Sequence, residues 1–261
     1  MSKEMPVVIL CGGRGTRMGT ETDALPKPML PIGDKPILWH IMRIYSYWGF
    51  NNFILALGYK GEVIKDYFLR YREHNSNVEV KLGTGSVRYL DATEVPDWTI
   101  KLVDTGLNTL KGGRIKRIEK YVSTDRFMLT YGDGLANIEI PKLLAFHEKH
   151  KKLGTLTGVN PPSRFGEIMV EGDRVISFSE KPQTSQGLIN GGFFVFESEL
   201  FDYLTPDEKC DFEKGPLEEL ASQGKLMVYL HKGMWECMDT PRDMEHLNKL
   251  WAEGKAFWKL W

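Results

Sequence analysis

Cysteine is scarce in this chain of 261 residues, which has only Cys11, Cys210 and Cys237. No two of them form a C-x-x-C pair, which argues against a zinc knuckle or a framework of disulfides. Sparse, unpaired cysteines are typical of a protein in a reducing compartment, so we expect a cytoplasmic location.

Long apolar runs and an excess of charge of one sign are also missing. No segment reaches the roughly 18 to 20 apolar residues that a membrane span needs, and the N-terminus has no signal-peptide pattern. The net charge is −1, which gives no general attraction to nucleic acid or to an anionic membrane. We therefore expect neither as a partner, and a phosphate site must come from a local group of basic residues.

The residues that are present describe an ordinary globular protein, with 42% hydrophobic and 26% charged residues. Short apolar runs read as strands alternate with amphipathic segments read as helices. The strands are expected at 6–11, 52–57, 127–131, 155–159, 175–179, 192–196 and 226–230. The helices are expected at 34–49, capped by Asp34, and at 62–74, 114–121, 140–152 and 242–253.

This alternation predicts an α/β fold: a mostly parallel mixed sheet, doubly wound in the Rossmann-like manner with helices on both faces. The chain has no internal repeat and no convincing linker. We therefore expect a single domain over residues 1–261.

A glycine-rich loop, Gly12-Gly13-Arg14-Gly15-Thr16-Arg17, follows the first strand. Glycines at such a place let backbone N–H groups approach phosphate oxygens closely. A dinucleotide fingerprint that starts at Gly13 would need Gly or Ala where Met18 stands, and the Gly-Lys-Ser/Thr of a Walker loop is missing. The alternative is an ordinary tight turn between a strand and a helix.

Lys27 stands between Pro26 and Pro28. Two prolines favour a stiff, extended segment, which would present the ammonium to a phosphate. The alternative is a solvated loop lysine.

Two aspartates, Asp133 and Asp239, follow predicted strands. The carboxyl ends of parallel strands are where α/β proteins bind ligands, and Mg²⁺ takes one or two carboxylates together with phosphate oxygens and water. The two side chains could therefore hold one Mg²⁺. The alternative is a turn or cap role, above all for Asp239, because Asp239-Thr240-Pro241 is also typical of a helix start.

Nine segments in order resemble the sugar-nucleotide pyrophosphorylase family and, within it, the enzymes that form CDP-glucose. The resemblance runs from Val7 to about Trp258, and Arg14 and Leu25 depart from the expected pattern. The segments are GGRGTRM, PKPMLPIGDKPILWHIM, GYKGEVIKDYF, LVDTG with GGRIKR, TYGDG, RFG, EKP, NGGFFVF and MDTPRD.

The resemblance implies a nucleotidyltransferase that joins CTP and α-D-glucose 1-phosphate and releases pyrophosphate, with Mg²⁺ held by Asp133 and Asp239. It implies a nucleotide-binding part over about 1–135 and a sugar-phosphate part over about 136–261. It also points to CDP-glucose supply for surface polysaccharide such as O-antigen, and to a homo-oligomer. Arg17, Lys27 and Lys181 are the implied catalytic residues.

The remaining implied site residues divide between the two substrates. Glu180, Lys181 and Asn190 would bind the sugar phosphate, although a surface charge pair and a simple turn are the alternatives there. The nucleotide would contact Leu10, Cys11, Gly12, Gly13, Arg14, Gly15, Thr16, Arg17, Lys27, Thr109, Arg114 and Gly132.

The choice of cytosine over uracil is expected to involve Thr109 and Arg114. Arg114 carries only donors, which suits the cytosine O2 and N3 acceptors. The alternative is a surface turn that leads into the helix at 114–121. Another triphosphate such as UTP or dTTP, another sugar 1-phosphate, or a non-catalytic regulatory subunit that binds nucleotide sugars also stays open.

Overall fold

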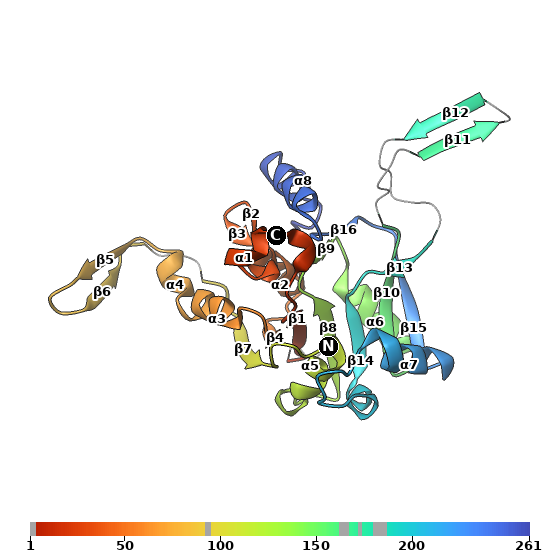
Figure 1. Cartoon of the computed structure of the whole chain (residues 1–261), viewed down its shortest axis with the longest axis horizontal. Helices are drawn as coiled ribbons and strands as arrows, with labels where there is room; N and C mark the ends of the chain where they lie inside the picture. The colour runs from red at the N-terminus through yellow and green to blue at the C-terminus, as the bar shows by residue number, and fades with distance from the viewer. Residues whose placement is uncertain (1–3, 92–94, 162–166, 172–173, 180–186) are drawn as a thin grey trace.

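A mixed sheet runs through the middle of the computed structural model, which describes residues 4–91, 95–161, 167–171, 174–179 and 187–261 (Figure 1). Its parallel half consists of β1 (Val7–Cys11) between β4 (Asn52–Leu57) and β8 (Arg126–Tyr131), with β7 (Thr99–Asp104) beside β4. These strands all point their carboxyl ends to the same edge of the sheet.

The other half of the sheet mixes directions. The strand β14 (Phe194–Glu197) is antiparallel to both β8 and β10 (Gly154–Val159). β10 in turn pairs with β13 (Ile189–Asn190) in the antiparallel sense and with β15 (Leu226–His231) in the parallel sense. The predicted α/β fold with a mostly parallel mixed sheet is therefore confirmed.

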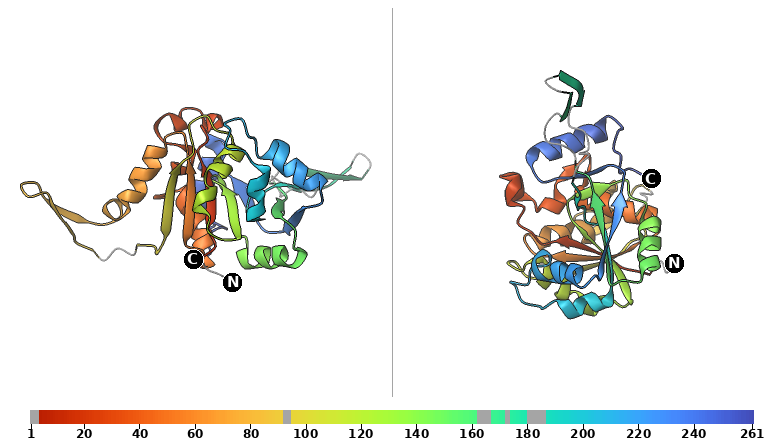
Figure 2. Two further views of the ribbon diagram at one scale, coloured as in Figure 1. Left: turned by 90° about the horizontal axis from the view of Figure 1, so that it is seen from below. Right: turned by 90° about the vertical axis from the view of Figure 1, so that its right-hand side faces the viewer.

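Helices cover both faces of the sheet (Figure 2). Successive residues of β1 alternate between two cores, with Val7 and Ile9 in one and Val8 and Leu10 in the other. The first core includes residues of α2 (Ile37–Tyr47), α3 (Gly61–Leu69), α6 (Ile140–His150) and α8 (Pro241–Ala252). The second includes residues of α5 (Lys111–Arg117), η4 (Ser198–Tyr203), η5 (Glu213–Leu217) and α7 (Glu218–Ser222). This is the doubly wound arrangement that the sequence predicted.

Three predicted helices have different limits in the structure. Asp34 does not cap α2: Lys35–Pro36 form the short strand β3 against β2 (Pro31–Ile32), and Asp34 pairs with Lys35 at 3.1 Å. The predicted helix at 62–74 is divided into α3 and α4 (Tyr71–His74), because the backbone of Arg70 leaves the helical region at φ −106°. The predicted helix at 114–121 is α5 followed by the 3₁₀ turn η3 (Glu119–Tyr121).

Two hairpins project from the body at opposite ends (Figure 1). The first joins β5 (Val78–Lys81) to β6 (Ser86–Tyr89), and the second joins β11 (Glu167–Glu171) to β12 (Arg174–Ser179). Within the described part of the chain, every helix is too short or too polar to cross a membrane.

Candidate active site

The ammonium of Lys27 lies between two carboxylates at the carboxyl edge of the sheet. Lys27 Nζ donates to Asp133 Oδ2 and to Asp239 Oδ1, each at 2.6 Å. The lysine side chain is 11% exposed, and the aspartate side chains are 27% and 19% exposed. We call Lys27, Asp133 and Asp239 the Lys27 cluster. It brings together three residues that the sequence analysis singled out separately.

A short strand pair joins the two aspartate segments. The strand β9 (Gly134–Ala136) is antiparallel to β16 (Trp235–Cys237), with Gly134 opposite Cys237. The N–H of Met238 donates to the carbonyl of Asp133 at 2.9 Å. Asp133 and Asp239 therefore flank one small ladder, which fixes both backbones beside Lys27.

Asp239 stands directly before α8, yet Thr240 is the residue that caps the helix. Thr240 Oγ1 accepts from Asp243 N at 3.3 Å, and Asp243 Oδ2 accepts from Thr240 N at 2.8 Å, which completes a capping box. Asp243 Oδ2 also accepts from Asp239 N at 3.0 Å. The side chain of Asp239 is thus left to face Lys27, and the alternative of a cap role for Asp239 is wrong.

Lys27 itself sits in η2 (Lys27–Met29), a 3₁₀ turn that follows the extended Pro26. The expected extended segment is therefore confirmed at Pro26 and wrong for Lys27. The side chain is buried, so the alternative of a solvated loop lysine is wrong as well.

Burial and pairing act in opposite directions on the pKa values of this cluster. Burial lowers the pKa of Lys27, but the charges and hydrogen bonds of Asp133 and Asp239 outweigh it and leave that pKa above its ordinary value. Burial raises the pKa of Asp239, and Lys27 together with Arg17 outweighs it and leaves that pKa below its ordinary value. Lys27 and Asp239 are therefore both charged at neutral pH.

Arg17 lies on the solvent side of the Lys27 cluster, in the 3₁₀ turn η1 (Thr16–Met18). Its Nη1 donates to Asp239 Oδ2 at 2.8 Å, and its side chain is 70% exposed. The glycine-rich loop around it opens to solvent. Leu10, Cys11 and Gly12 are buried, Gly15 is partly buried with a left-handed φ of 63°, and Gly13, Arg14 and Thr16 are exposed.

Arg114 lies beneath this loop and is only 4% exposed, so the alternative of a surface turn is wrong for it. A Cβ on Gly12 would lie 2.2 Å from Arg114 Nη1, which requires glycine there. The guanidinium donates to five oxygens: the carbonyls of Gly12, Leu57, Gly106 and Leu107 and the hydroxyl of Thr105. Burial, followed by the nearby charge of Arg117, lowers the pKa of Arg114.

Thr109, the other expected base contact, is also buried and accepts from Arg117 Nη1 at 2.9 Å. Arg117, which also donates to the carbonyl of Thr105 at 2.9 Å, was not singled out from the sequence. Contacts of Thr109 and Arg114 with the base stay predictions.

On the sugar side, Glu180 and Lys181 lie outside the described residues. Asn190 Nδ2 donates to the Tyr131 hydroxyl at 3.0 Å, and that hydroxyl donates to Glu213 Oε1 at 2.9 Å. Burial and the charge of Glu213 raise the pKa of Tyr131. Sequence reasoning missed Tyr131 and Glu213, although Tyr131 stands in the same TYGDG segment as Gly132 and Asp133.

The described residues contain no group of three or more His, Cys, Asp or Glu side chains that could hold a metal ion alone. Asp133 and Asp239 nevertheless direct two carboxylate oxygens to one cationic atom. Mg²⁺ commonly takes one or two carboxylates and completes its octahedron with water and substrate phosphate. The pair fits an ion that binds together with a phosphate ligand.

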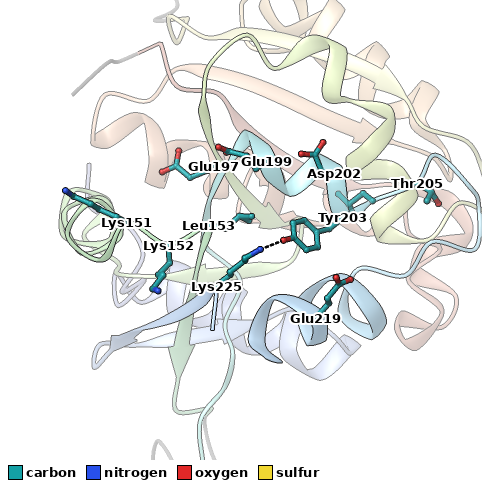
Figure 3. Close-up of a pocket in the computed structure, with 11 residues that line it drawn as sticks. Lys151, Lys152, Leu153, Glu197, Glu199, Asp202, Tyr203, Thr205, Glu219 and Lys225 are labelled. Atoms are coloured by element: carbon teal, nitrogen blue, oxygen red, sulfur yellow. Dashed lines mark hydrogen bonds between the residues drawn. The ribbon is translucent and has the colours of Figure 1, made fainter. Parts of the chain in front are cut away.

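A cavity of about 800 Å³ lies elsewhere, lined by lysines and carboxylates that include Lys225 and Glu197 (Figure 3). Glu197 stands opposite Arg126, the first residue of β8, whereas Asp133 follows the last residue of that strand. The cavity therefore belongs to the opposite edge of the sheet from the Lys27 cluster. Its charges are of both signs, and Lys225 Nζ donates to the Tyr203 hydroxyl at 2.7 Å.

Comparison with known proteins identifies the family of the chain. The family described as Nucleotidyl transferase matches residues 6–253. The probable glucose-1-phosphate cytidylyltransferase of Bacillus subtilis (strain 168) is 47% identical over 257 residues, 98% of this chain and 100% of the relative. The glucose-1-phosphate cytidylyltransferase of Salmonella typhimurium is 46% identical over 258 residues, again 98% and 100%.

A solved structure supports the same conclusion for the fold. The crystal structure of HddC from Yersinia pseudotuberculosis superposes with a TM-score of 0.68 at 23% identity, covering 95% of this chain and 99% of that one. This similarity concerns the fold alone. The match over residues 6–253 and the 47% identity over 98% of the chain show that the chain belongs to the nucleotidyl transferase family.

Proposed function

We propose that the chain transfers a cytidylyl group from CTP to α-D-glucose 1-phosphate and releases pyrophosphate and CDP-glucose. The observation that carries the proposal is the meeting of Lys27, Asp133 and Asp239 beside the glycine-rich loop. The 47% identity to a relative with that activity in its name, over nearly the whole chain, supports the choice of substrates. The pathway served would be one that consumes CDP-glucose.

The reaction needs alignment and charge neutralisation. An oxygen of glucose 1-phosphate attacks the α-phosphorus of CTP in line, and the bond to the bridging oxygen of pyrophosphate breaks. The attacking phosphate is already ionised, so no general base is needed. Lys27 would bind the α- and β-phosphates, Arg17 would face the leaving pyrophosphate, and Lys181 would bind the sugar phosphate with Glu180 and Asn190 at the sugar hydroxyls.

We also propose that Asp133 and Asp239 hold Mg²⁺, which supplies positive charge at the α-phosphate. The shared hydrogen bonds to Lys27 support this, because they hold two hard oxygen ligands toward one point. One aspartate comes from the expected nucleotide part and the other from the expected sugar part, which supports a single domain with the site between its two parts.

A homo-oligomer in the cytoplasm remains part of the proposal. The pairs Val78 with Tyr89 and Val80 with Val87 alternate along the β5–β6 hairpin with Glu79 paired to Arg88. This gives one apolar face on a hairpin that stands clear of the body (Figures 1 and 2). A lone two-stranded hairpin is marginal in water, and a second copy of the chain would cover that face.

Light scattering after size-exclusion chromatography tests the oligomer. The parent should elute as an oligomer, and Val80→Lys, which places a charge on the apolar face, should shift it toward the monomer. Thr84→Lys, in the turn of the same hairpin, is the matched control. A monomeric parent would contradict this part of the proposal.

The substrate proposal is tested by incubating the protein with Mg²⁺, glucose 1-phosphate and each nucleoside triphosphate in turn, and measuring pyrophosphate release. CTP should give the highest rate. A faster reaction with UTP or dTTP would identify a different nucleotide, and a faster reaction with another sugar 1-phosphate would identify a different acceptor. If no combination of triphosphate and sugar 1-phosphate released pyrophosphate, a non-catalytic regulatory subunit would be favoured.

A further inference from the structure

The segment 58–60, between β4 and α3, contacts the glycine-rich loop at several separate points. The N–H of Tyr59 donates to the carbonyl of Gly12 at 3.1 Å, at the start of the loop. The Tyr59 hydroxyl donates to the carbonyl of Thr22 at 3.1 Å, beyond the end of the loop. Between these points, the guanidinium of Arg14 lies 5.7 Å from the centre of the Tyr59 ring.

Lys60 adds a second attachment beyond the end of the loop. Its Nζ donates to the carbonyl of Asp23 and, at 3.2 Å, to the carbonyl of Ala24. Both acceptors lie in α1 (Glu21–Ala24), the short helix between the glycine-rich loop and Lys27. An ammonium that donates to carbonyls forms charge-assisted hydrogen bonds, which are stronger than neutral ones.

The backbone of this segment is unusual in a way that supports a role in function. Lys60 has a φ of 51°, in the left-handed region that residues other than glycine rarely adopt. A Cβ on Gly58 would lie 2.7 Å from the carbonyl oxygen of Gly12 and 2.3 Å from Arg114 Nη1, so glycine is needed there. Such positions persist where the surrounding structure enforces them, and they gather at ligand-binding loops.

We propose that Gly58, Tyr59 and Lys60 form a clasp that fixes the start of the glycine-rich loop and the helix α1 that follows it, and so positions the loop for the triphosphate. The clasp holds Gly12 at one end and residues 22–24 at the other. The stretch 13–19 between them contains Gly13 and Gly19, where an added Cβ would meet open space. That stretch carries Arg17, so a fixed frame would set where its guanidinium can reach.

Tyr59 and Lys60 are therefore positioning residues, which act on the substrate through the loop. The link to a triphosphate rests on the proposed function, whereas the link to the loop does not. An experiment on the loop without substrate separates the two.

Limited digestion with trypsin measures how often the loop opens, because Arg14 and Arg17 are both exposed cleavage sites within it. Cleavage after each arginine is followed by mass spectrometry in the full chain without nucleotide. Lys60→Met keeps the length of the side chain and removes its donors, and Tyr59→Phe keeps the ring and removes the hydroxyl. Cleavage after Arg88, in the remote β5–β6 hairpin, serves as the internal reference.

We expect loop cleavage about tenfold faster in Lys60→Met and several-fold faster in Tyr59→Phe, the order expected for a lost charged and a lost neutral hydrogen bond. Cleavage after Arg88 should be unchanged. Lys65→Met, in the helix α3 that follows Lys60, is the matched control and should behave as the parent. Lys60→Arg, whose guanidinium can also donate to the two carbonyls, should restore slow cleavage.

Parent-like loop cleavage in both Lys60→Met and Tyr59→Phe would overturn the clasp. Kinetics form the second arm: Lys60→Met should raise KM for CTP several-fold more than KM for glucose 1-phosphate. Equal changes in both values would overturn the link to the triphosphate. If the parent does not turn over CTP, the proposed function fails while the digestion result still decides the clasp.

Discussion

Two ionic clusters lie at opposite edges of the same sheet. They differ in how far strand pairing brings their residues together. At the carboxyl end of β8, Lys27 forms ion pairs with both Asp133 and Asp239. At the amino end of β8, Glu197 Oε1 lies 2.7 Å from Arg126 Nη2 and 3.0 Å from His147 Nε2. The first cluster has two carboxylates around one lysine, and the second has one carboxylate between an arginine and a histidine.

Strand register accounts for the Arg126–Glu197 pair of the second cluster, but for only part of the Lys27 cluster. Arg126 and Glu197 stand directly opposite each other on β8 and β14, so their pairing follows from the strands. In the Lys27 cluster, the β9–β16 ladder brings Asp133 and Asp239 together. Lys27 lies outside the strands, in the 3₁₀ turn η2, and no register places its ammonium between the two carboxylates. The two carboxylates there share the ammonium of Lys27, and Asp239 also accepts from Arg17, so four charged side chains meet beside the glycine-rich loop. We infer that the Lys27 cluster serves chemistry and the Glu197 group serves stability.

The sharpest way to break this comparison is Asp133→Asn, which keeps the size of the side chain and removes a hard anionic ligand. Turnover should fall at least about a hundredfold, because charge stabilisation in the transition state is lost. Pyrophosphate release gives the rate, and circular dichroism confirms the fold. Near-parent turnover in a folded Asp133→Asn protein would remove the assignment of the metal site.

The next largest effect distinguishes the lysine proposed to bind CTP from the lysine proposed to bind glucose 1-phosphate. Lys27→Ala should mainly impair use of CTP, and Lys181→Ala should mainly impair use of glucose 1-phosphate. Each change removes charged hydrogen bonds worth roughly 1.5–3 kcal/mol, or about 10- to 150-fold. Steady-state kinetics in which one substrate is varied at a time give KM for CTP and KM for glucose 1-phosphate in each variant. Part of the loss in either variant can appear in kcat. The reverse pattern would overturn the partition.

A smaller effect concerns the base. CTP should be used more efficiently than UTP, because a site built for one pattern of donors and acceptors leaves buried groups unpaired with the other. Arg114→Ala should narrow the ratio of kcat/KM values for the two triphosphates. Arg114 also donates hydrogen bonds to the carbonyls of Gly12 and Leu57, so it could instead support the backbone of the loop. Equal losses with CTP and UTP would mean that Arg114 supports the loop and does not read the base.

The smallest effect on activity is expected from Glu197→Gln. The free energy of unfolding should fall by about 1–3 kcal/mol, because Arg126 loses an ionic partner that is only partly exposed. Turnover should stay within about twofold of the parent, as expected for a change remote from the reacting atoms. Urea unfolding and pyrophosphate release measure the two quantities. A large loss of turnover with unchanged stability would contradict the assignment of the Glu197 group to stability.

The sequence predicted the parts of this protein that depend on local pattern. The apolar runs at β1 and β4 and the position of Asp133 after a strand need no distant information. The strand β7 was missed because its side chains alternate in exposure and form no continuous apolar run. The division between α3 and α4 turns on the backbone of one residue, Arg70, which no periodicity reveals.

The candidate site was predictable as a set of residues but not as an arrangement. Pairing of β9 with β16 places Asp239 beside Asp133, and such non-local pairs leave little trace in a single sequence. The burial of Arg114 beneath the glycine-rich loop also depends on distant carbonyls. The glycine at position 12 was foreseen for phosphate, and the structure adds that its bare Cα makes room for Arg114.

Crystals of the protein with Mn²⁺ and CTP offer the most direct test of the Lys27 cluster, because Mn²⁺ shares the preference of Mg²⁺ for carboxylate, water and phosphate oxygens and scatters anomalously. We predict an anomalous peak bonded to carboxylate oxygens of both Asp133 and Asp239 and to a phosphate oxygen of CTP. A bound nucleotide with its manganese peak away from both aspartates would contradict the account.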